Sequence, residues 1–256
     1  MPTRTPLSRE RVLRTALALA DEAGVEALSM RKLAKQLGVE AMSLYNHIAS
    51  KEDLVSGIVD LVFEEIEPPP AGVDWRTAMR ARAVSTREAL LRHPWANGLM
   101  EARAQPGPAN ARLHEACLKC LREAGFSLAE TVHAYSIQDS FIYGFALQER
   151  ALPDSFEDPD VSAQVAARQM AQVPVDAYPY LAEMLTEHIP VHGYDYTAEF
   201  EFGLDLILDG LEARRLAAGG PLGARTSPTG APGARAPRRP RSPCSRGPRA
   251  PCRRSS

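Results

Sequence analysis

The chain has 256 residues, 45% of them hydrophobic, which is enough for one or two domains with a sizeable core. No signal peptide is visible, and the longest apolar runs fall far short of the roughly 20 residues that a membrane-spanning helix needs. Four cysteines in a chain of this length are too few for a disulfide scaffold. The composition therefore favours an intracellular protein over a membrane protein or a small secreted domain.

The net charge of −2 conceals an uneven distribution. Residues 217–256 hold nine arginines and no acid, which leaves 21 basic and 32 acidic residues for positions 1–216. Residues 1–53 are close to balance, with 8 basic and 7 acidic residues, so the excess acid lies beyond them. Because an acidic surface repels DNA, any contact with DNA is expected at the N-terminal end.

The first predicted helix runs from Ser8 to Ala23, with Gly24 as its C-cap. Its apolar residues recur at helical spacing and predict one buried face. They are Val12, Leu13, Ala16, Leu17, Leu19 and Ala20.

The most informative stretch is Ser29–Asp53, which begins with a second short helix. Ser29 is a good N-cap, and the apolar stripe that follows consists of Leu33, Ala34 and Leu37. Gly38 is predicted to end this helix, because a left-handed C-cap costs glycine nothing sterically. The chain can then turn sharply into the next segment.

A third short helix, predicted for Glu40–His47, directs Leu44 and Ile48 inward. Its outward side chains are Ala41, Met42, Ser43, Tyr45, Asn46 and His47. Small residues let a helix approach DNA, polar groups reach base edges, and a thioether can touch thymine methyl groups. The pattern predicts a helix-turn-helix, and a compact hairpin with a solvated polar face is the alternative.

The start of the fourth helix adds a phosphate-binding feature. Ser50 and Asp53 form a capping-box pattern, and Lys51 stands in the first turn. A phosphate there could be bound by both the lysine and the helix N-terminus.

The region after Pro68–Pro70, which end the fourth helix, is predicted to be helical as far as position 216. Helices are expected from Asp74 to His93, Ala109 to Ala124, Ser127 to Arg150, Val161 to Met170, Tyr178 to Glu187 and Thr197 to Leu216. The helix at 127–150 is apolar on more than one face and so needs two partners. Close helix approach would be allowed by Gly144, Gly203 and Gly210.

The tail, residues 217–256, is rich in Pro, Gly, Ala, Ser and Arg and predicts a disordered segment. It would either add sequence-independent affinity for DNA or be a functionless extension of the reading frame.

The run RVLRTALALADEAGVEALSMRKLAKQLGVEAMSLYNHIASKEDLV resembles the DNA-binding domain of the TetR family of bacterial repressors, over residues 8 to about 66. The resemblance implies an all-α fold with a three-helix helix-turn-helix domain at 1–66 and a larger helical effector-binding and dimerisation domain at 67–216. It further implies a homodimeric repressor that binds palindromic double-stranded operator DNA in the cytoplasm, at the bacterial nucleoid, and is released by a small-molecule effector. An effector-independent regulator or an activator of the same fold is the alternative.

The family's DNA contacts transfer to matching positions. By this correspondence Tyr45, His47 and Lys51 meet operator phosphates. Base contacts are expected from Arg31, Ala41, Met42, Ser43 and Asn46, and Ser29 completes the predicted DNA-binding set.

The C-terminal region resembles the tetracycline-repressor branch, through GFSL at 125–128 and EFEFGLDLILDGLEARR near its end. In that family the counterparts of the helices at 127–150 and 197–216 pair with a second subunit, which implies a four-helix dimer interface. The residues expected to face an effector pocket are Arg82, Thr86, Met100, Arg103, Cys117, Ile137 and Gln148.

The sequence also departs from the tetracycline repressor. Met100 and Gln148 replace its histidine and glutamate magnesium ligands, and Glu67 stands where a histidine would contact the drug. We therefore expect no metal, and tetracycline is a poor candidate for the effector. The arginines could favour an acidic or polar ligand, or they could be solvated or paired with Glu101 or Glu115.

An enzyme is the rival interpretation from another class. It would use Cys117 as nucleophile with the histidines His93, His114, His133, His188 and His192, but no HExxH motif, nucleophile elbow or phosphate loop supports it. No catalytic residue and no cofactor are predicted. Cys117 and Cys120 are interpreted as structural thiols, with redox sensing as the alternative, and the other cysteines, Cys244 and Cys252, lie in the tail.

Overall fold

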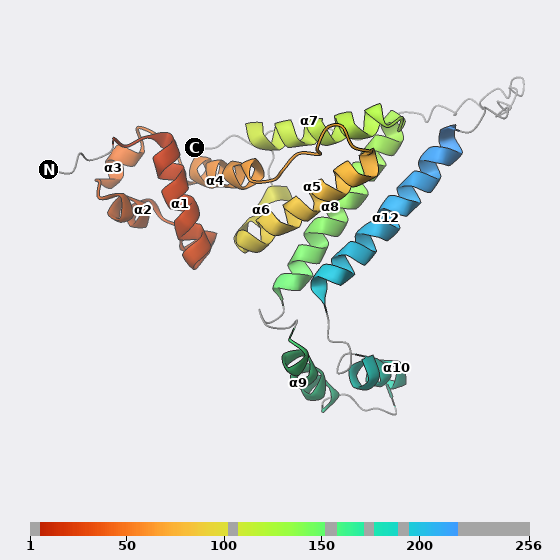
Figure 1. Ribbon diagram of the computed structural model, residues 1–256. Helices are drawn as coiled ribbons and strands as arrows, with labels where there is room; N and C mark the ends of the chain where they lie inside the picture. The colour runs from red at the N-terminus through yellow and green to blue at the C-terminus, as the bar shows by residue number, and fades with distance from the viewer. Residues whose placement is uncertain (1–5, 102–106, 152–157, 172–176, 189–194, 220–256) are drawn as a thin grey trace, which may run out of the picture. The chain divides into compact units, whose positions relative to one another are not determined.

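The structure, a computed structural model, describes residues 6–101, 107–151, 158–171, 177–188 and 195–219. Within these residues the fold is entirely helical, which confirms the predicted fold class (Figure 1). The predicted tail lies, from position 220 onward, outside the described residues, as do Arg103, His192, Cys244 and Cys252. No helix of the described ranges is both long and apolar enough to cross a bilayer.

The N-terminal helices form one compact group around a shared apolar core. They are α1 (Arg9–Ala23), the short 3-10 helix η1 (Val25–Ala27), α2 (Met30–Leu37), α3 (Ala41–Leu44) and α4 (Lys51–Glu64). Helix α1 packs against both α2 and α4, and α2 packs against α3. Gly57 permits the approach of α4 to α1, because a Cβ atom there would collide with the Leu13 side chain.

The remaining helices begin with α5, and several of them pack in pairs. They are α5 (Trp75–Arg92), η2 (Pro94–Ala96), α6 (Asn97–Glu101), α7 (Pro108–Glu123), α8 (Leu128–Arg150), α9 (Pro159–Met170), α10 (Pro179–Glu183), the π-helical η3 (Met184–His188) and α12 (Tyr196–Gly219). Helix α8 packs against α5, α7 and α12. The two longest helices, α8 and α12, lie side by side in Figure 1.

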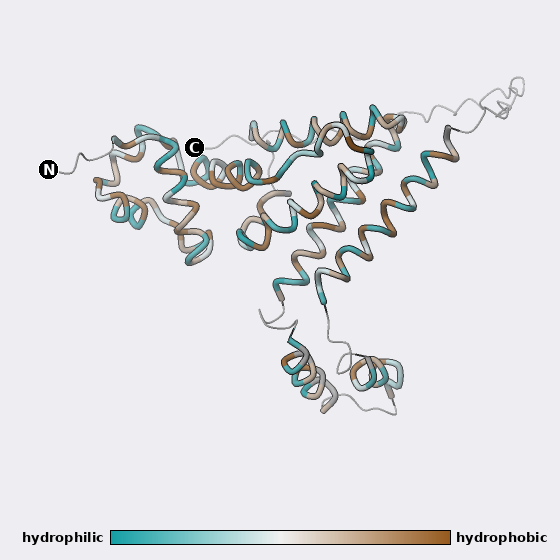
Figure 2. The backbone as a smooth tube through the Cα atoms, in the orientation of Figure 1, coloured by the Kyte–Doolittle hydropathy of each residue, from teal (hydrophilic) through white to brown (hydrophobic). Residues whose placement is uncertain are grey.

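Helix α4 joins the two groups, because it packs on α7 as well as on α1. Figure 2 shows that α4 is predominantly hydrophobic, whereas hydrophobic and hydrophilic residues alternate along α8 and α12. The Asp60 carboxylate of α4 accepts hydrogen bonds from the backbone N–H groups of Ala109 (3.1 Å) and Asn110 (3.3 Å). The N-cap of α7 is Gly107, which has no side chain, so a residue of another helix supplies the missing cap.

Local sequence signals place most helix ends correctly. The side chains of Ser29, Ser50, Asp74 and Ser127 each accept the N–H of the residue three positions later, at 3.0–3.3 Å. Gly38 ends α2 in the left-handed conformation, with φ 67°, as predicted. These caps depend only on neighbours in the chain, which is why the sequence reveals them.

Three short elements, η1, η2 and α6, were not predicted. Pro94 follows the last residues of α5 but opens η2, because the missing N–H of proline is not needed in the first turn of a helix. Helix α6 then continues directly from η2. The predicted helix at 178–187 is divided between α10 and the π-helical η3.

Aromatic side chains fill the contact between α8 and α12. Phe200 lies 5.3 Å from the ring of Phe141 and 5.2 Å from that of Phe145. A Cβ atom at Gly203 would lie 2.7 Å from Phe141, so this glycine permits close approach within the chain, as expected. Cβ atoms at Gly144 and Gly210 would meet nothing within 4 Å among the described residues.

Candidate DNA-binding surface and helical core

The helix-turn-helix forms because α2 and α3 bury small apolar stripes on either side of Gly38. Leu33 and Leu37 of α2 and Leu44 of α3 are all buried, and Ile48 is buried just beyond the turn that follows α3. The backbone N–H of Val39 bonds to the carbonyl of Ala34, which fixes the turn. The helices on both sides of the turn are therefore held by one core.

The predicted DNA-binding residues lie in this unit, and several expose large side chains. Met42 is 75% exposed and Tyr45 is 47% exposed, which is unusual for side chains of their size. Asn46, Arg31 and Lys51 are also exposed, and the half-buried members of the set are Ser29, Ala41, Ser43 and His47. The outer side of α3 and the turn after it thus present groups that can contact a base edge or a phosphate.

The third helix is shorter than predicted. Helix α3 covers only Ala41–Leu44, and Tyr45, Asn46 and His47 continue it as a hydrogen-bonded turn. Glu40 at its N-cap makes no side-chain cap, and Leu44 is the one fully buried residue within the helix. Short helices without caps are marginal, so the surrounding core and not local helix propensity holds this segment.

Arg9 braces the segment from α1, a contact that sequence reasoning missed. Its guanidinium makes two hydrogen bonds to the Asp53 carboxylate, at 2.6 and 3.0 Å, and one to the backbone carbonyl of His47, at 2.9 Å. Asp53 also accepts the backbone N–H of Ala49 at 2.9 Å. In the predicted capping box it would instead accept the backbone N–H of Ser50, one residue later. The hydrogen bond from Arg9 lowers the pKa of Asp53 below its ordinary value.

The residues predicted to face an effector pocket fall into two groups. Arg82, Thr86, Met100 and Cys117 are buried in the helical core. Ile137 is 48% exposed, Gln148 is exposed as well, and Arg103 lies outside the described residues. The structure therefore brings four of the seven into the interior.

Arg82 is wholly buried and forms an ion pair, with its Nη1 atom 2.6 Å from Oδ1 of Asp139. The alternative that this arginine is solvated is therefore wrong, and its partner is Asp139 of α8, whereas Glu115 is exposed. The side chain of Glu101, the other partner considered, lies outside the description. Burial alone would lower the pKa of Arg82, but the charge of Asp139 raises it above its ordinary value. The guanidinium consequently keeps its charge inside the core.

The thiols of α7 are unreactive in their present surroundings. Burial raises the pKa of Cys117 to about 11 and also raises the pKa of Cys120 above its ordinary value. Both are free thiols in the described chain, and the thiolate form is the reactive one. Their protonation at neutral pH favours the structural interpretation over redox sensing.

The histidines do not assemble around Cys117. His93 contacts Asp21 and Glu65, His114 stacks on Tyr135 with ring centroids 4.2 Å apart, and His133 is exposed. Across the described ranges, no group of three or more His, Cys, Asp and Glu side chains could hold a metal ion. The side chain of His188 and the whole of His192 lie outside the description.

His93, at the end of α5, instead contacts residues of α1 and of the end of α4. We call this group the His93 cluster, and it consists of His93, Trp95, Asp21 and Glu65. The ring nitrogens of the buried His93 lie 2.7 Å from Asp21 Oδ1 and 3.1 Å from Glu65 Oε1. The indole N–H of Trp95 donates to the same oxygen of Asp21, at 2.7 Å. Asp21 belongs to α1, so the cluster links the helix-turn-helix unit to the C-terminal helices.

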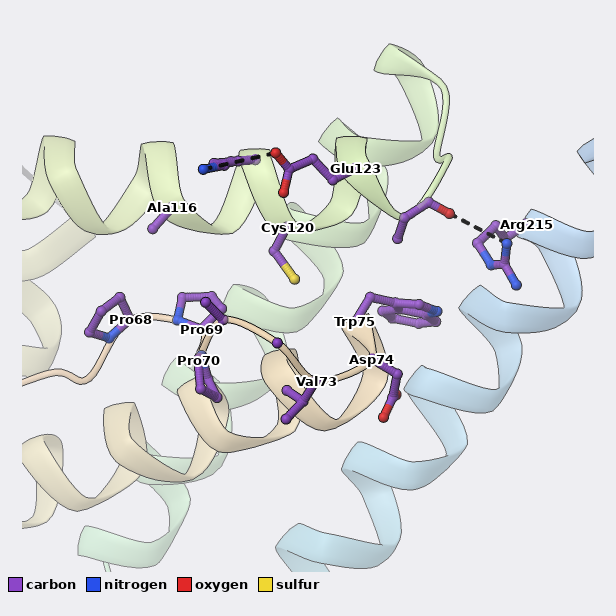
Figure 3. Close-up of a pocket in the computed structure, with 14 residues that line it drawn as sticks. Pro68, Pro69, Pro70, Val73, Asp74, Trp75, Ala116, Cys120, Glu123 and Arg215 are labelled. Atoms are coloured by element: carbon purple, nitrogen blue, oxygen red, sulfur yellow. Dashed lines mark hydrogen bonds and ion pairs between the residues drawn. The ribbon is translucent and has the colours of Figure 1, made fainter.

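A surface groove of about 630 Å³ lies between the segment before α5 and helix α7 (Figure 3). Pro68, Pro69 and Trp75 line one side, Cys120 and Glu123 line the other, and Arg215 of α12 stands at one end. The described residues predicted to face an effector pocket do not line this groove. The groove is therefore separate from the buried residues around Arg82.

Two domain families match the chain in the regions just described. The family described as "Bacterial regulatory proteins, tetR family" matches residues 12–58, and "Tetracyclin repressor-like, C-terminal domain" matches residues 67–215. The chain belongs to the TetR family. The helix-turn-helix is accordingly the DNA-binding part of a transcriptional regulator.

Several transcriptional regulators are similar to this TetR-family chain along most of their length. The tetracycline repressor protein class A of Escherichia coli is 33% identical over 83% of this chain and 94% of its own length. The repressor DrrR1 of Streptomyces coeruleorubidus is 33% identical over 82% of this chain and 80% of its own. An HTH-type transcriptional regulator of Saccharopolyspora erythraea is 31% identical, with 82% and 87% covered.

Solved structures share the fold of most of the TetR-family chain. Apo ActR from Streptomyces coelicolor has a TM-score of 0.69 at 27% identity, covering 84% of this chain and 99% of its own. ActR in complex with actinorhodin gives 0.66 at 27% identity, covering 82% and 99%. The Q116A variant of TetR from Acinetobacter baumannii, in complex with minocycline, gives 0.63 at 26% identity, covering 82% and 96%.

The brace from Arg9 predicts a pH-dependent contribution to stability. Asp53→Asn should lower the free energy of unfolding by up to about 1 kcal/mol at neutral pH, because the ion pair is partly exposed. The lowered pKa means that this contribution is complete above the ordinary value of about 3.9 and is lost as the pH falls through the lower folded value. Urea unfolding of the variant and the wild type across this range measures the difference.

Glu10→Gln is the matched control, because Glu10 pairs with Arg14 on the exposed side of α1. Its effect should be smaller at every pH. A difference between the Asp53 variant and the wild type that stayed constant down to the lowest pH would contradict the assigned ion pair.

The His93 cluster predicts a second stability effect. Asp21→Ala should cost about 1–3 kcal/mol, because the Trp95 N–H and a ring nitrogen of the buried His93 lose their acceptor. Glu22→Ala, at the neighbouring exposed position, should stay within about 0.5 kcal/mol of the wild type. Urea unfolding followed by helical circular dichroism compares the two, and equal stability would contradict the cluster.

Proposed function

We propose that this protein is a homodimeric repressor that binds a palindromic operator and is released from it by a small molecule. The observation that carries the proposal is the helix-turn-helix with exposed Met42, Tyr45 and Asn46 beside a buried apolar core. The names of its relatives, which include several repressors, support the direction of regulation. A DNA-binding repressor of this kind acts in the cytoplasm, at the nucleoid.

The DNA contacts divide by chemistry. Tyr45, His47 and Lys51 meet phosphates, and Lys51 does so at the N-terminus of α4, where the helix dipole also favours an anion. Base edges are contacted by Arg31, Ala41, Met42, Ser43 and Asn46, and Ser29 holds the start of α2. Phosphate contacts supply affinity and register, whereas base contacts supply sequence preference.

Dimerisation is supported by apolar side chains that no described part of the chain covers. Phe202 and Leu206, one turn apart on α12, are 64% and 59% exposed. Gly210, one further turn along, faces open space, as does Gly144 on α8. Apolar side chains beside open glycines suit the close packing of a second pair of helices, which would form a four-helix interface.

Release by an effector is supported by the buried polar residues of α5 and α8 and by solved relatives. ActR has been crystallised with actinorhodin and a TetR variant with minocycline. We infer that binding in the C-terminal core moves α4 through its contacts with α7 and the His93 cluster. Because Asp60 and Asp21 connect these helices, a shift in the core changes the separation of the two DNA-binding units.

The first experiment is selection of bound sequences from a random DNA pool by the purified protein, with sizing of the complex. A palindrome with half-sites about one helical turn or slightly more apart, bound by a dimer, is the expected result. Recovery of no sequence preference would overturn the operator part of the proposal. An effector-independent regulator or an activator would bind the same palindrome, and the direction of the ligand's effect distinguishes them.

Residue variants test the division between phosphate and base contacts. Lys51→Ala should weaken binding about equally on all sequences and reduce the salt slope by about 1, whereas Asn46→Ala should change the selected sequence. Tyr45→Phe should weaken binding without changing the salt slope. Lys119→Ala, an exposed lysine of α7, is the charge-matched control and should change neither property. If Lys51 and Asn46 variants behaved alike, the assignment of contacts would be wrong.

A charge in the proposed interface tests dimerisation. Leu206→Glu should convert the dimer into a monomer, because the carboxylate would be buried without a partner between two copies. Leu91→Glu, on an exposed position of α5, is the matched control and should remain a dimer. Sedimentation measures the mass, and a dimer that tolerates Leu206→Glu would move the interface elsewhere.

A further inference from the structure

The His93 cluster places a buried imidazole ring between two carboxylates. Nδ1 of His93 lies 2.7 Å from Oδ1 of Asp21, and Nε2 lies 3.1 Å from Oε1 of Glu65. The side chain of His93 is only 8% exposed, whereas those of Asp21 and Glu65 are 32% and 36% exposed. The ring is therefore held inside the protein, and protons can reach it past its partly exposed partners.

This arrangement requires one proton on each ring nitrogen. An ionised carboxylate can only accept hydrogen bonds, and a neutral imidazole carries a single N–H. A neutral ring would consequently turn the lone pair of its other nitrogen toward a carboxylate oxygen. Both contacts of His93 are hydrogen bonds only while the ring is the charged imidazolium.

Other donors hold the two carboxylates in their ionised form. The indole N–H of Trp95 donates to Oδ1 of Asp21 at 2.7 Å. The guanidinium of Arg92 donates to Oε2 of Glu65, with Nε at 3.1 Å and Nη2 at 3.0 Å. Hydrogen bonds to a charged carboxylate favour that form. The additional proton of the cluster therefore belongs on the ring and not on either carboxylate.

The charged groups around the ring come from four helices. Asp21 belongs to α1, Glu65 follows the last residue of α4, and Arg92 is the last residue of α5. From α8, Arg150 donates to the backbone carbonyl of Pro94 at 3.0 Å. The formal charges of these four side chains cancel. The groups that touch the ring itself are the two carboxylates, and they favour its charged form.

The cluster joins the DNA-binding unit to the C-terminal helices. Helix α1, which carries Asp21, also packs against α2 of the helix-turn-helix. Loss of the ring proton would leave either Asp21 or Glu65 facing a lone pair. The apolar packing of α1 on α4 would remain, but the polar contact that ties α1 and the end of α4 to the end of α5 would be broken on one side.

We propose that the His93 cluster is a proton-operated link, which holds the DNA-binding unit firmly while the ring is charged and loosens it when the ring becomes neutral. This inference rests on the proposed function and adds regulation by pH to it. The link is complete at low pH and is lost as the pH rises through the ring's own transition. Because a palindrome is bound by two units at a fixed separation, a looser attachment should weaken operator binding.

The first test needs no DNA. Nitrogen NMR of the labelled histidine rings in the full-length protein, from about pH 5 to about pH 9, should show two protons on His93 at the low end and one at the high end. The protection of the α1 backbone N–H groups near Asp21 against hydrogen exchange, corrected for intrinsic rates, should fall at the same pH. A constant number of ring protons, or protection that does not follow them, would overturn the proposal.

Glu65→Gln separates a proton-dependent link from a merely structural contact. The amide N–H of glutamine can donate to the unprotonated Nε2 of a neutral ring, which a carboxylate cannot do. Protection of α1 in this variant should therefore be equal at both ends of the pH range. Glu64→Gln is the matched control, because the neighbouring Glu64 pairs with Arg112 on the surface, and it should keep the wild-type pH dependence. A Glu65→Gln protein that also kept this dependence, or that lost protection at every pH, would contradict the role of the proton.

Operator binding provides the second test, with the palindrome obtained by selection as the probe. The wild type should bind at least about fivefold more weakly at the high end of the range, and Glu65→Gln should show a smaller change. His47, for which we propose a phosphate contact, titrates in both proteins, so the difference between them isolates the link. An equal change in the two proteins would overturn the proposal.

Failure of this inference and failure of the proposed function are distinguishable. A protein that selects no palindrome, but whose α1 protection follows the His93 protons, would keep the link and lose the repressor. A protein that selects a palindrome, but whose α1 protection ignores those protons, would keep the repressor and lose the link.

Discussion

The structure depends on helix α4 packing against two partners at once. On one side Gly57 lets α4 approach Leu13 of α1, and on the other Asp60 caps the N-terminus of α7. A helix with buried residues toward both partners cannot shift without disturbing one of them, because packed interiors do not deform continuously. The position of the DNA-binding unit is consequently tied to the interior of the C-terminal helices.

The contacts that connect these helices include polar ones beside a shared apolar core. The His93 cluster and the Asp60 cap are sets of directional hydrogen bonds with defined partners. Directional contacts have a small number of good arrangements, so they would suit the movement that we propose for effector release.

Polar groups in the C-terminal core carry a cost in stability. An ordinary core would replace the Arg82–Asp139 pair and Gln138 with apolar residues of similar volume, which is often neutral or stabilising. Stability alone therefore does not account for polar side chains at these positions. Met100, which the resemblance aligns with a metal ligand of the tetracycline repressor, is an apolar side chain in a buried place.

The sequence by itself determined most of the helices and their caps, because these depend on residues a few positions apart. Ser29, Gly38 and Asp74 act through neighbours within one helical turn, so their roles could be predicted without a fold. The tertiary structure alone decided which distant charges meet: Arg9 with Asp53, Arg82 with Asp139, and His93 with Asp21. Local spacing carries no information on such pairs, because their partners come from helices that only the packing of the apolar faces brings together.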